Sequence, residues 1–233
     1  TKKICEFRRI KKCYVMLDVS RNGVLNTDSV REWLHFFALA GINGFMVYTE
    51  DSYEVEGEPL FGYMRGKYSK EELRFFDKIA ASLGIEMIPC IQTLAHLQRI
   101  LQYPAYHKIK DTESVLLCEE KATLDFVEKM IMEASSPYKS KRIHIGMDEA
   151  WDLGRGQYLT RNGYKEPFVM MTKHLSEVLK ITEKLGLKPM IWSDMFFRAV
   201  SKTGHYYDPE VKFDKNMIKM VPKNVDLVYW DYY

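Results

Sequence analysis

The sequence lacks the long apolar runs and the strong net charge that mark membrane-spanning and nucleic-acid-binding proteins. No run of about 18 apolar residues occurs in the 233 residues, so we expect no transmembrane helix. Acidic and basic residues are intermixed and leave a net charge of +2, which argues against binding to nucleic acid or a membrane surface. The first residues are charged and include no long apolar segment, so we expect no signal peptide and a cytoplasmic location.

Cysteine is scarce, and its four positions are scattered. Cys5, Cys13, Cys90 and Cys118 form no C-x-x-C pair or other metal-ligand spacing, so we expect no metal site and no cofactor. Cys13 and Cys90 lie inside apolar, strand-like runs, which favours buried free thiols in a reducing compartment. No sequence feature indicates an oligomeric state.

Strand-like and helix-like segments alternate along the chain, which predicts an α/β fold with parallel strands. The expected strands cover residues 12–20, 45–49, 85–91, 142–147, 188–194 and 225–231. The expected helices begin at residue 28 and cover residues 69–83, 119–134, 167–185 and 213–220. Because no linker or repeat divides the chain, we expect one domain over residues 1–233.

Two architectures fit this alternation, a (β/α)8 TIM barrel and a doubly wound open sheet. A nucleotide-binding open sheet should carry a glycine-rich turn after its first strand, but only Gly23 lies there. Polar or aromatic residues instead follow the expected strands, which is typical of a barrel whose strand ends converge on one centre. Since a barrel needs eight strands and about 250 residues, we expect a TIM barrel truncated after about six βα units, with its C-terminal strands missing.

Two adjacent carboxylates, Asp148 and Glu149, end the apolar strand that begins at Arg142, and Gly146 allows the backbone to bend there. One carboxylate can stay ionised while its neighbour, opposed by that charge, keeps a proton. Glycoside hydrolysis uses this division of labour between two carboxyl groups. We therefore expect both residues to be catalytic and to face one cleft.

Several segments resemble glycoside hydrolase family 20, the β-N-acetylhexosaminidases. Residues 144–149 (HIGMDE) resemble the family's H-x-G-x-D-E motif, and residues 17–21 (LDVSR) resemble its first strand, which ends in an arginine. Residues 49–51 (TED) match T-[DE]-D, and Trp192 and Tyr229-x-Asp231 match later aromatic and polar positions. The third strand usually reads P-E-I-D-x-P-G-H, but residues 89–96 read PCIQTLAH, so we expect a divergent branch of the family.

The resemblance implies an exo-acting, retaining β-N-acetylhexosaminidase that removes terminal β-linked GlcNAc or GalNAc from glycans. In this mechanism the substrate's acetamido oxygen attacks the anomeric carbon, Asp148 stabilises the oxazolinium-like intermediate, and Glu149 acts as acid and then as base. The expected substrate-binding residues are Arg21, Asp51, His96, His144, Trp192, Tyr229 and Asp231. Of these, His144 is expected to hold the side chain of Asp148.

In the last expected strand, the direction of each side chain decides which residues can line the substrate pocket. Residues two apart in a strand share a face, so we expect Tyr229 and Asp231 to face the sugar and Trp230 to point away. Trp192 is therefore the better candidate for an apolar wall of the pocket.

Two other functions stay open. A metal-dependent barrel hydrolase can draw ligands from His96, His144, Asp148 and Glu149, although no H-x-H or H-E-x-x-H spacing occurs. A carbohydrate-binding barrel without catalysis is the other alternative, and the intact Asp148-Glu149 pair argues against it. Neither GlcNAc nor GalNAc is favoured by the sequence.

Overall fold

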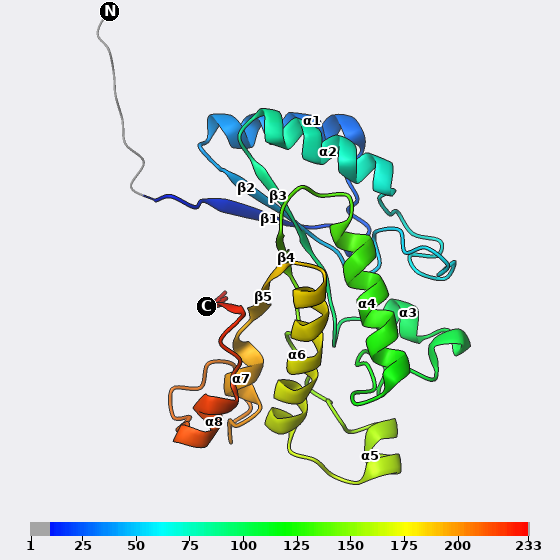
Figure 1. The fold of residues 1–233 in the computed structure, drawn as a ribbon, viewed down its shortest axis with the longest axis vertical. Coiled ribbons are helices and arrows are strands. Elements are labelled where there is room, and N and C mark those ends of the chain that lie inside the picture. Colours follow the sequence, from blue (N-terminus) through cyan, green and yellow to red (C-terminus); the bar gives the residue numbers. More distant parts are fainter. Residues whose placement is uncertain (1–9, 233) are drawn as a thin grey trace, which may run out of the picture.

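The computed structural model describes residues 10–232 and contains one curved sheet of six parallel strands (Figure 1). The strands pair in chain order, each with the next. They are β1 (Tyr14–Asp18), β2 (Gly44–Tyr48), β3 (Glu86–Cys90), β4 (Arg142–His144), β5 (Lys188–Trp192) and β6 (Asp226–Val228). This order confirms the prediction of a TIM-barrel arrangement with six βα units.

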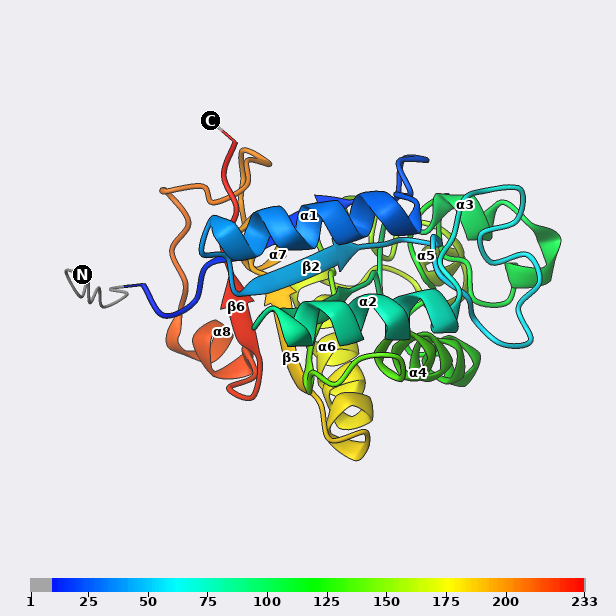
Figure 2. The same ribbon diagram turned by 90° about the horizontal axis from the view of Figure 1, so that it is seen from above.

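Four long helices cover the outer face of the sheet, with α1 beside α2 and α4 beside α6 (Figures 1 and 2). These are α1 (Thr27–Leu39), α2 (Lys70–Ser82), α4 (Lys121–Ser135) and α6 (Pro167–Lys184). The shorter elements are α3 (Gln98–Leu101), η1 (Pro104–Tyr106), α5 (Gln157–Asn162), α7 (Asp194–Arg198) and α8 (Lys215–Met220). All four long helices were expected, whereas α3, η1, α5 and α7 are too short to show a helical period.

Local sequence explains where the helices start. The Asn26 side chain accepts a hydrogen bond from the Ser29 N–H at the start of α1. At α2, the Ser69 hydroxyl accepts from the Glu72 N–H while the Glu72 carboxylate accepts from the Ser69 N–H, and the two bonds together form a capping box.

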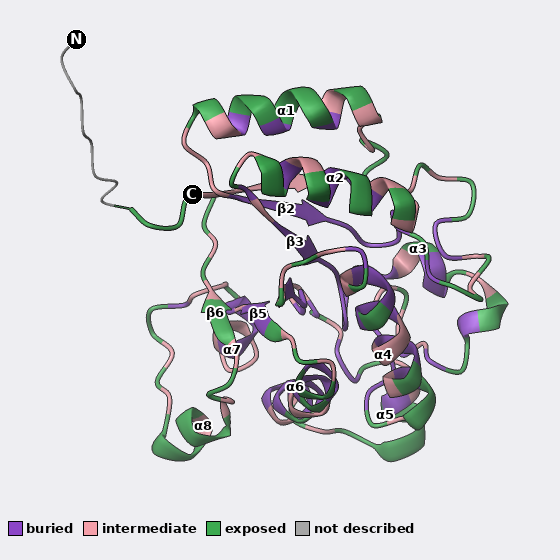
Figure 3. Ribbon diagram, turned by 45° about the horizontal axis from the view of Figure 1, so that its top comes forward, coloured by how far each residue is buried: buried purple, intermediate pink, exposed green. Residues whose placement is uncertain are grey.

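Apolar side chains cover both faces of the sheet, so its central strands are almost wholly buried (Figure 3). On the outer face, Phe45 of β2 packs against Phe37 of α1 with ring centroids 5.2 Å apart. The inner face holds a second, smaller cluster of Met46, Tyr48, Ile88, Cys90 and Met190. Because alternate residues of β2 serve the two clusters, the side chain of Tyr48 points to the inside of the barrel.

The cysteines only partly follow the prediction. Cys90 and Cys118 are buried free thiols, but Cys13 is exposed because it precedes β1 and lies outside the sheet. Cys5 lies outside the described residues. Over residues 10–232, no helix combines the length and the apolar character needed to cross a bilayer.

Candidate active site

Five of the expected site residues come together at the carboxyl ends of the strands, the end at which barrel sites are built. Arg21 follows β1, His96 follows β3, Asp148 and Glu149 follow β4, and Trp192 ends β5. His96 lies beside the two carboxylates, and the other four residues line a cavity of about 190 Å³. The complete lining is Met16, Asp18, Arg21, Tyr48, Asp148, Glu149, Trp192, Trp230 and Tyr232.

An irregular backbone turns both carboxylates towards this cavity. Gly146, Met147 and Glu149 have φ values of +71°, +69° and +52°, which lie in the left-handed region that side chains other than glycine rarely adopt. At Gly146 a Cβ atom would lie 2.2 Å from Oε1 of Gln92, so only glycine fits there. Adjacent side chains of an extended strand point apart, and this turn is what lets Asp148 and Glu149 share one cavity.

Asp148 is held by two side chains. Nε2 of Gln92 donates to its Oδ1 at 2.7 Å, and Nε2 of His96 lies 3.1 Å from its Oδ2. Burial by itself would raise the pKa of Asp148, but the hydrogen bond and the charge of His96, together with the Gln92 amide, outweigh burial and lower the pKa below its ordinary value. Asp148 is therefore ionised at neutral pH.

Glu149 has a more open environment. Its side chain is 32% exposed, against 15% for Asp148. Tyr206 donates its hydroxyl to Oε1 at 2.9 Å, and Nε2 of His96 lies 3.5 Å from Oε2. The Glu149 backbone N–H donates to Oδ2 of Asp194 at 3.1 Å, which fixes the main chain while the carboxyl group stays accessible.

An ion pair of Arg21 and Glu50 supports His96 from behind. Nη1 of Arg21 lies 2.6 Å from Oε1 of Glu50, and Nδ1 of His96 lies 3.8 Å from the same oxygen. Burial lowers the pKa of His96, but Asp148, Glu50 and Glu149 raise it further, so the net shift is upward. His96 therefore links one buried carboxylate to the two carboxylates of the cavity.

Asp194, the first residue of α7, is the most strongly perturbed acid of the site. Burial, and next the charge of Asp148, raise its pKa to about 7. Its Oδ2 accepts the Glu149 N–H at 3.1 Å, and this hydrogen bond offsets part of the rise in pKa.

The family model described as "Glycosyl hydrolase family 20, catalytic domain" matches residues 14–232. The chain belongs to glycosyl hydrolase family 20. The family that the sequence motifs indicated is thereby confirmed.

Relatives and solved structures agree with this membership. Hexosaminidase D of Homo sapiens is 25% identical over 205 residues, which make up 84% of this chain and 40% of that protein. A β-N-acetylhexosaminidase of Bacteroides fragilis has a TM-score of 0.75 and 18% identity, covering 96% of this chain and 46% of that one. An exo-β-N-acetylglucosaminidase of Vibrio harveyi, solved with N-acetylglucosamine, has a TM-score of 0.73 and 17% identity, covering 96% and 38%. The chain thus spans less than half the length of each.

The family's T-[DE]-D segment contributes a different acid from the one we expected. Asp51 does not line the cavity but forms a buried ion pair with Arg65. The preceding residue, Glu50, reaches Arg21 and His96 instead. The Thr49 N–H still donates to the Cys90 carbonyl, so the alternation of β2 continues past Tyr48. Glu50 therefore faces the inside of the barrel as Tyr48 does, and Asp51 faces the other way.

The last strand also differs from the prediction. Tyr229 is 60% exposed and donates to Oδ2 of Asp231 at 2.7 Å, and neither residue lines the cavity. Trp230 and Tyr232 line it instead, which reverses the predicted faces. Strand β6 already ends at Val228, so the alternation that we extended to residue 231 does not hold there.

His144 does not hold Asp148, as we had expected. Its fully buried ring packs on Trp192 at 4.4 Å between centroids, and Nδ1 accepts the Gly146 N–H at 3.1 Å. Burial lowers the pKa of His144 to about 4, so the ring is neutral. Gln92 and His96 make the contacts to Asp148 in its place.

Several residues that contact the acid pair or its partners were not among our candidates, including Tyr48, Glu50, Gln92, Asp194 and Tyr206. Glu50 and Gln92 lie inside the segments that resemble the family, and Asp194 follows the fifth strand, so their positions were visible in the sequence. Tyr206 comes from the irregular segment between α7 and α8, where no periodic pattern predicts its direction.

A cation can find ligands in this site. One ligand atom each from His96, Asp148 and Glu149 lies within 4.8 Å of the others. The same atoms already form the hydrogen-bonded contacts of the acid pair, and His144 points away to Trp192. The metal-dependent alternative therefore has three of its four proposed ligands in place.

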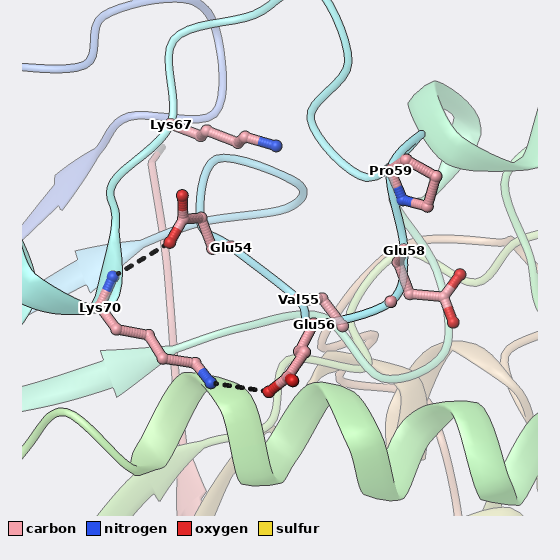
Figure 4. A pocket seen from close by; sticks show the side chains of 8 residues that line it. Glu54, Val55, Glu56, Glu58, Pro59, Lys67 and Lys70 are labelled. Carbon is pink, nitrogen blue, oxygen red and sulfur yellow. Dashed lines mark hydrogen bonds and ion pairs between the residues drawn. The ribbon is translucent and has the colours of Figure 1, made fainter.

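A second cavity, of about 450 Å³, lies along the long segment between β2 and α2 (Figure 4). Its polar groups already have partners within the protein: the Lys70 backbone N–H donates to Glu54 at 3.4 Å, and Lys70 Nζ lies 3.7 Å from Glu56. Lys67 donates to the Phe61 carbonyl at 3.0 Å. No histidine lines this cavity, and its groups offer no acid-base pair comparable to that of the first site.

Proposed function

We propose that this chain carries the catalytic site of a retaining, exo-acting β-N-acetylhexosaminidase. The observation that carries the proposal is the unequal pair at the end of β4: Asp148 is ionised and held on both oxygens, whereas Glu149 is more exposed and reaches the cavity from the same turn. Family membership and the name of the human relative, Hexosaminidase D, support the same chemistry.

In the proposed reaction the nucleophile belongs to the substrate. Asp148 accepts a hydrogen bond from the acetamido N–H, which directs the acetamido oxygen to the anomeric carbon. As the new C–O bond forms, the glycosidic C–O bond breaks and Glu149 gives its proton to the leaving oxygen. Glu149 then takes a proton from water, which opens the oxazolinium ring at the anomeric carbon and restores the β configuration.

The lining of the cavity suits a sugar ring. Trp192 and Trp230 supply flat apolar walls for the ring or its acetamido methyl group. Arg21 lies in the same lining, where its guanidinium can donate to sugar hydroxyls while it stays paired with Glu50.

The leaving group would lie on the side of Glu149. An aromatic cluster begins there: Tyr206, which contacts Glu149, lies 6.2 Å from Trp151 and 5.0 Å from Trp230 between ring centroids. The Arg198 guanidinium lies 5.2 Å from the centre of the Trp151 ring. These groups can hold the second sugar of a glycan through ring stacking and hydrogen bonds.

The test is turnover by the full-length protein of 4-nitrophenyl glycosides of N-acetyl-β-glucosamine and N-acetyl-β-galactosamine. We expect release of nitrophenol from at least one of them, β configuration in the first-formed sugar by NMR, and no cleavage of the matching β-glucoside. Equal cleavage of the glucoside would contradict the substrate-assisted mechanism. Tight binding of the sugars by the wild-type protein without turnover would favour a carbohydrate-binding barrel.

A further inference from the structure

Gln92 is a fully buried amide in the wall behind Asp148, and each of its polar atoms has a partner. Nε2 donates to Oδ1 of Asp148 at 2.7 Å and to the Tyr48 hydroxyl at 2.9 Å. Oε1 accepts the Met147 N–H at 3.1 Å. One side chain therefore holds both the carboxylate and the backbone that leads to it.

The turn before Asp148 is shaped around this amide. Oε1 of Gln92 approaches Gly146 so closely that a Cβ atom there would lie 2.2 Å away. Met147, which donates to the same oxygen, has a φ of +69°. The unfavourable backbone conformation is thus compensated by a hydrogen bond that Gln92 supplies.

A carboxylic acid at this position would change the chemistry of the contact. The family pattern that residues 89–96 resemble has an aspartate where this chain has Gln92. An ionised carboxylate has no N–H to donate, so a side-chain acid could hydrogen-bond to Asp148 only while one of the two carried a proton. Gln92 donates to Asp148 at any pH.

We propose that Gln92 is a positioning residue: its amide fixes Asp148 as a carboxylate facing the substrate's acetamido N–H, without the shared proton that an acid would require. The consequence is a site that keeps its geometry on the alkaline side, where an acid pair would lose its proton and separate. The role in the reaction rests on the proposed function, whereas the effect on Asp148 does not.

Other charged and titratable groups also face Asp148 and set the background for this effect. His96 and Glu149 lie on the cavity side, Glu50 lies behind His96, Asp194 comes from α7, and Tyr48 comes from β2. All of them are unchanged in a Gln92 variant, so a difference between variants reports the side chain at position 92.

The test compares wild type with Gln92→Glu, which keeps the length and replaces the donor by an acid, and Gln92→Met, which keeps the length and removes the polar atoms. The first measurement is an NMR titration of the Asp148 carboxyl carbon in protein labelled with ¹³C-aspartate, with Asp148→Asn to assign the signal. We expect the titration of Asp148 in Gln92→Glu to move upward by roughly 1–2 pH units relative to wild type. An unchanged titration would overturn the proposal.

The second measurement is the pH dependence of kcat for an N-acetylhexosaminide. Gln92→Glu should stay within about threefold of wild type near pH 5 and lose at least about tenfold near pH 8, whereas Gln92→Met should be slow at both. Gln92→Met with the wild-type kcat and pH profile would show that Gln92 only packs. If wild type cleaves no N-acetylhexosaminide, the proposed function fails, and the NMR titration still decides whether Gln92 holds Asp148 as a carboxylate.

Discussion

Asp148 and Glu149 are neighbours in the chain, yet their surroundings differ as much as those of two separate sites. Around Asp148 the contacts are short, buried and polar, with Gln92 and His96 on its two oxygens. Around Glu149 the side chain is about twice as exposed, and its partner Tyr206 belongs to an aromatic cluster at the surface. In the proposed mechanism Asp148 keeps one orientation and one charge, which its enclosure favours, whereas Glu149 gains and loses a proton, which its exposure allows.

The largest effect is expected when each carboxylate is removed separately. Glu149→Gln should lower kcat by about 10²–10⁴-fold for a disaccharide but far less for a 4-nitrophenyl glycoside, because an easily displaced group needs little protonation. Asp148→Asn should lower kcat by roughly 10²–10³-fold for both substrates, because it removes charge that stabilises the intermediate. Steady-state kinetics on the two substrates measures this, and equal sensitivity of both variants to the leaving group would refute the division of roles.

A second test uses the matched acids Glu50 and Asp51. Glu50→Gln removes the charge that Arg21 and His96 share, so kcat/KM should fall by up to about 10²-fold through misplacement of His96. Asp51→Asn breaks only the buried pair with Arg65, so it should lower the melting temperature while kcat/KM of the folded protein stays within about twofold. The opposite pattern would place the functional acid at residue 51.

Glu50 and Asp51 also show how much of the site could be predicted from the sequence. The apolar strands and their parallel order follow from periodicity. The H-x-G-x-D-E resemblance placed Asp148 and Glu149 after a strand, and in the structure they follow β4. The choice between Glu50 and Asp51 depends on which face of β2 points inwards, and a strand that is apolar on both faces does not show this in its sequence.

The prediction for the last strand was wrong for a related reason. We applied the alternation of a strand to residues 229–231, but β6 ends at Val228, and Trp230 rather than Tyr229 reaches the cavity. His144 was misassigned because its partner is a backbone N–H two residues away, a contact created by the turn at Gly146. Such contacts depend on backbone conformations that no periodic pattern encodes.

A third test concerns the pH dependence of stability, through Asp194. Its pKa is raised to about 7 by burial and by Asp148, whereas an unfolded aspartate titrates near 3.9. Between those two pH values the folded chain holds a proton on Asp194 that the unfolded chain lacks. The contribution of Asp194 to the free energy of unfolding is therefore greatest below about pH 4 and falls as the pH rises to about 7. Asp194→Asn should abolish this loss, which is up to about 1.4 kcal/mol per pH unit.

The measurement is urea unfolding of wild type and Asp194→Asn at pH 5, 6, 7 and 8. The free energy of unfolding of the variant, relative to wild type, should rise over this range. His144, with a pKa lowered to about 4, contributes the opposite slope, but it is present in both proteins and cancels in the difference. Asp28→Asn, on the exposed side of α1, is the control: the loss of its contact with Arg31 should change the free energy of unfolding by a small amount that stays constant with pH. A constant difference for Asp194→Asn would show that Asp194 does not titrate in this range.

The smallest expected effect lies on the open side of the comparison, at Trp151. Trp151 is 58% exposed, its ring centroid lies 6.2 Å from that of Tyr206, and the Arg198 guanidinium lies over both rings. Stacking of a second sugar on such a ring contributes about 0.5–1.5 kcal/mol, so Trp151→Ala should lower kcat/KM for a disaccharide by roughly 2–12-fold. As a comparison substrate we use an N-acetylhexosaminyl fluoride, whose leaving group is a single atom and has no ring. Trp151→Ala should leave kcat/KM for this fluoride unchanged.

Trp33→Ala removes a similarly exposed tryptophan from α1, on the outer helix layer, and is the matched control. It should leave both substrates unaffected. If Trp151→Ala slowed the fluoride as much as the disaccharide, Trp151 would act on Glu149 itself through Tyr206, and the open side would then be as constrained as the side of Asp148. A loss confined to the disaccharide instead makes the exposed rings a surface for the leaving group, which explains why this half of the site is neither buried nor tightly hydrogen-bonded.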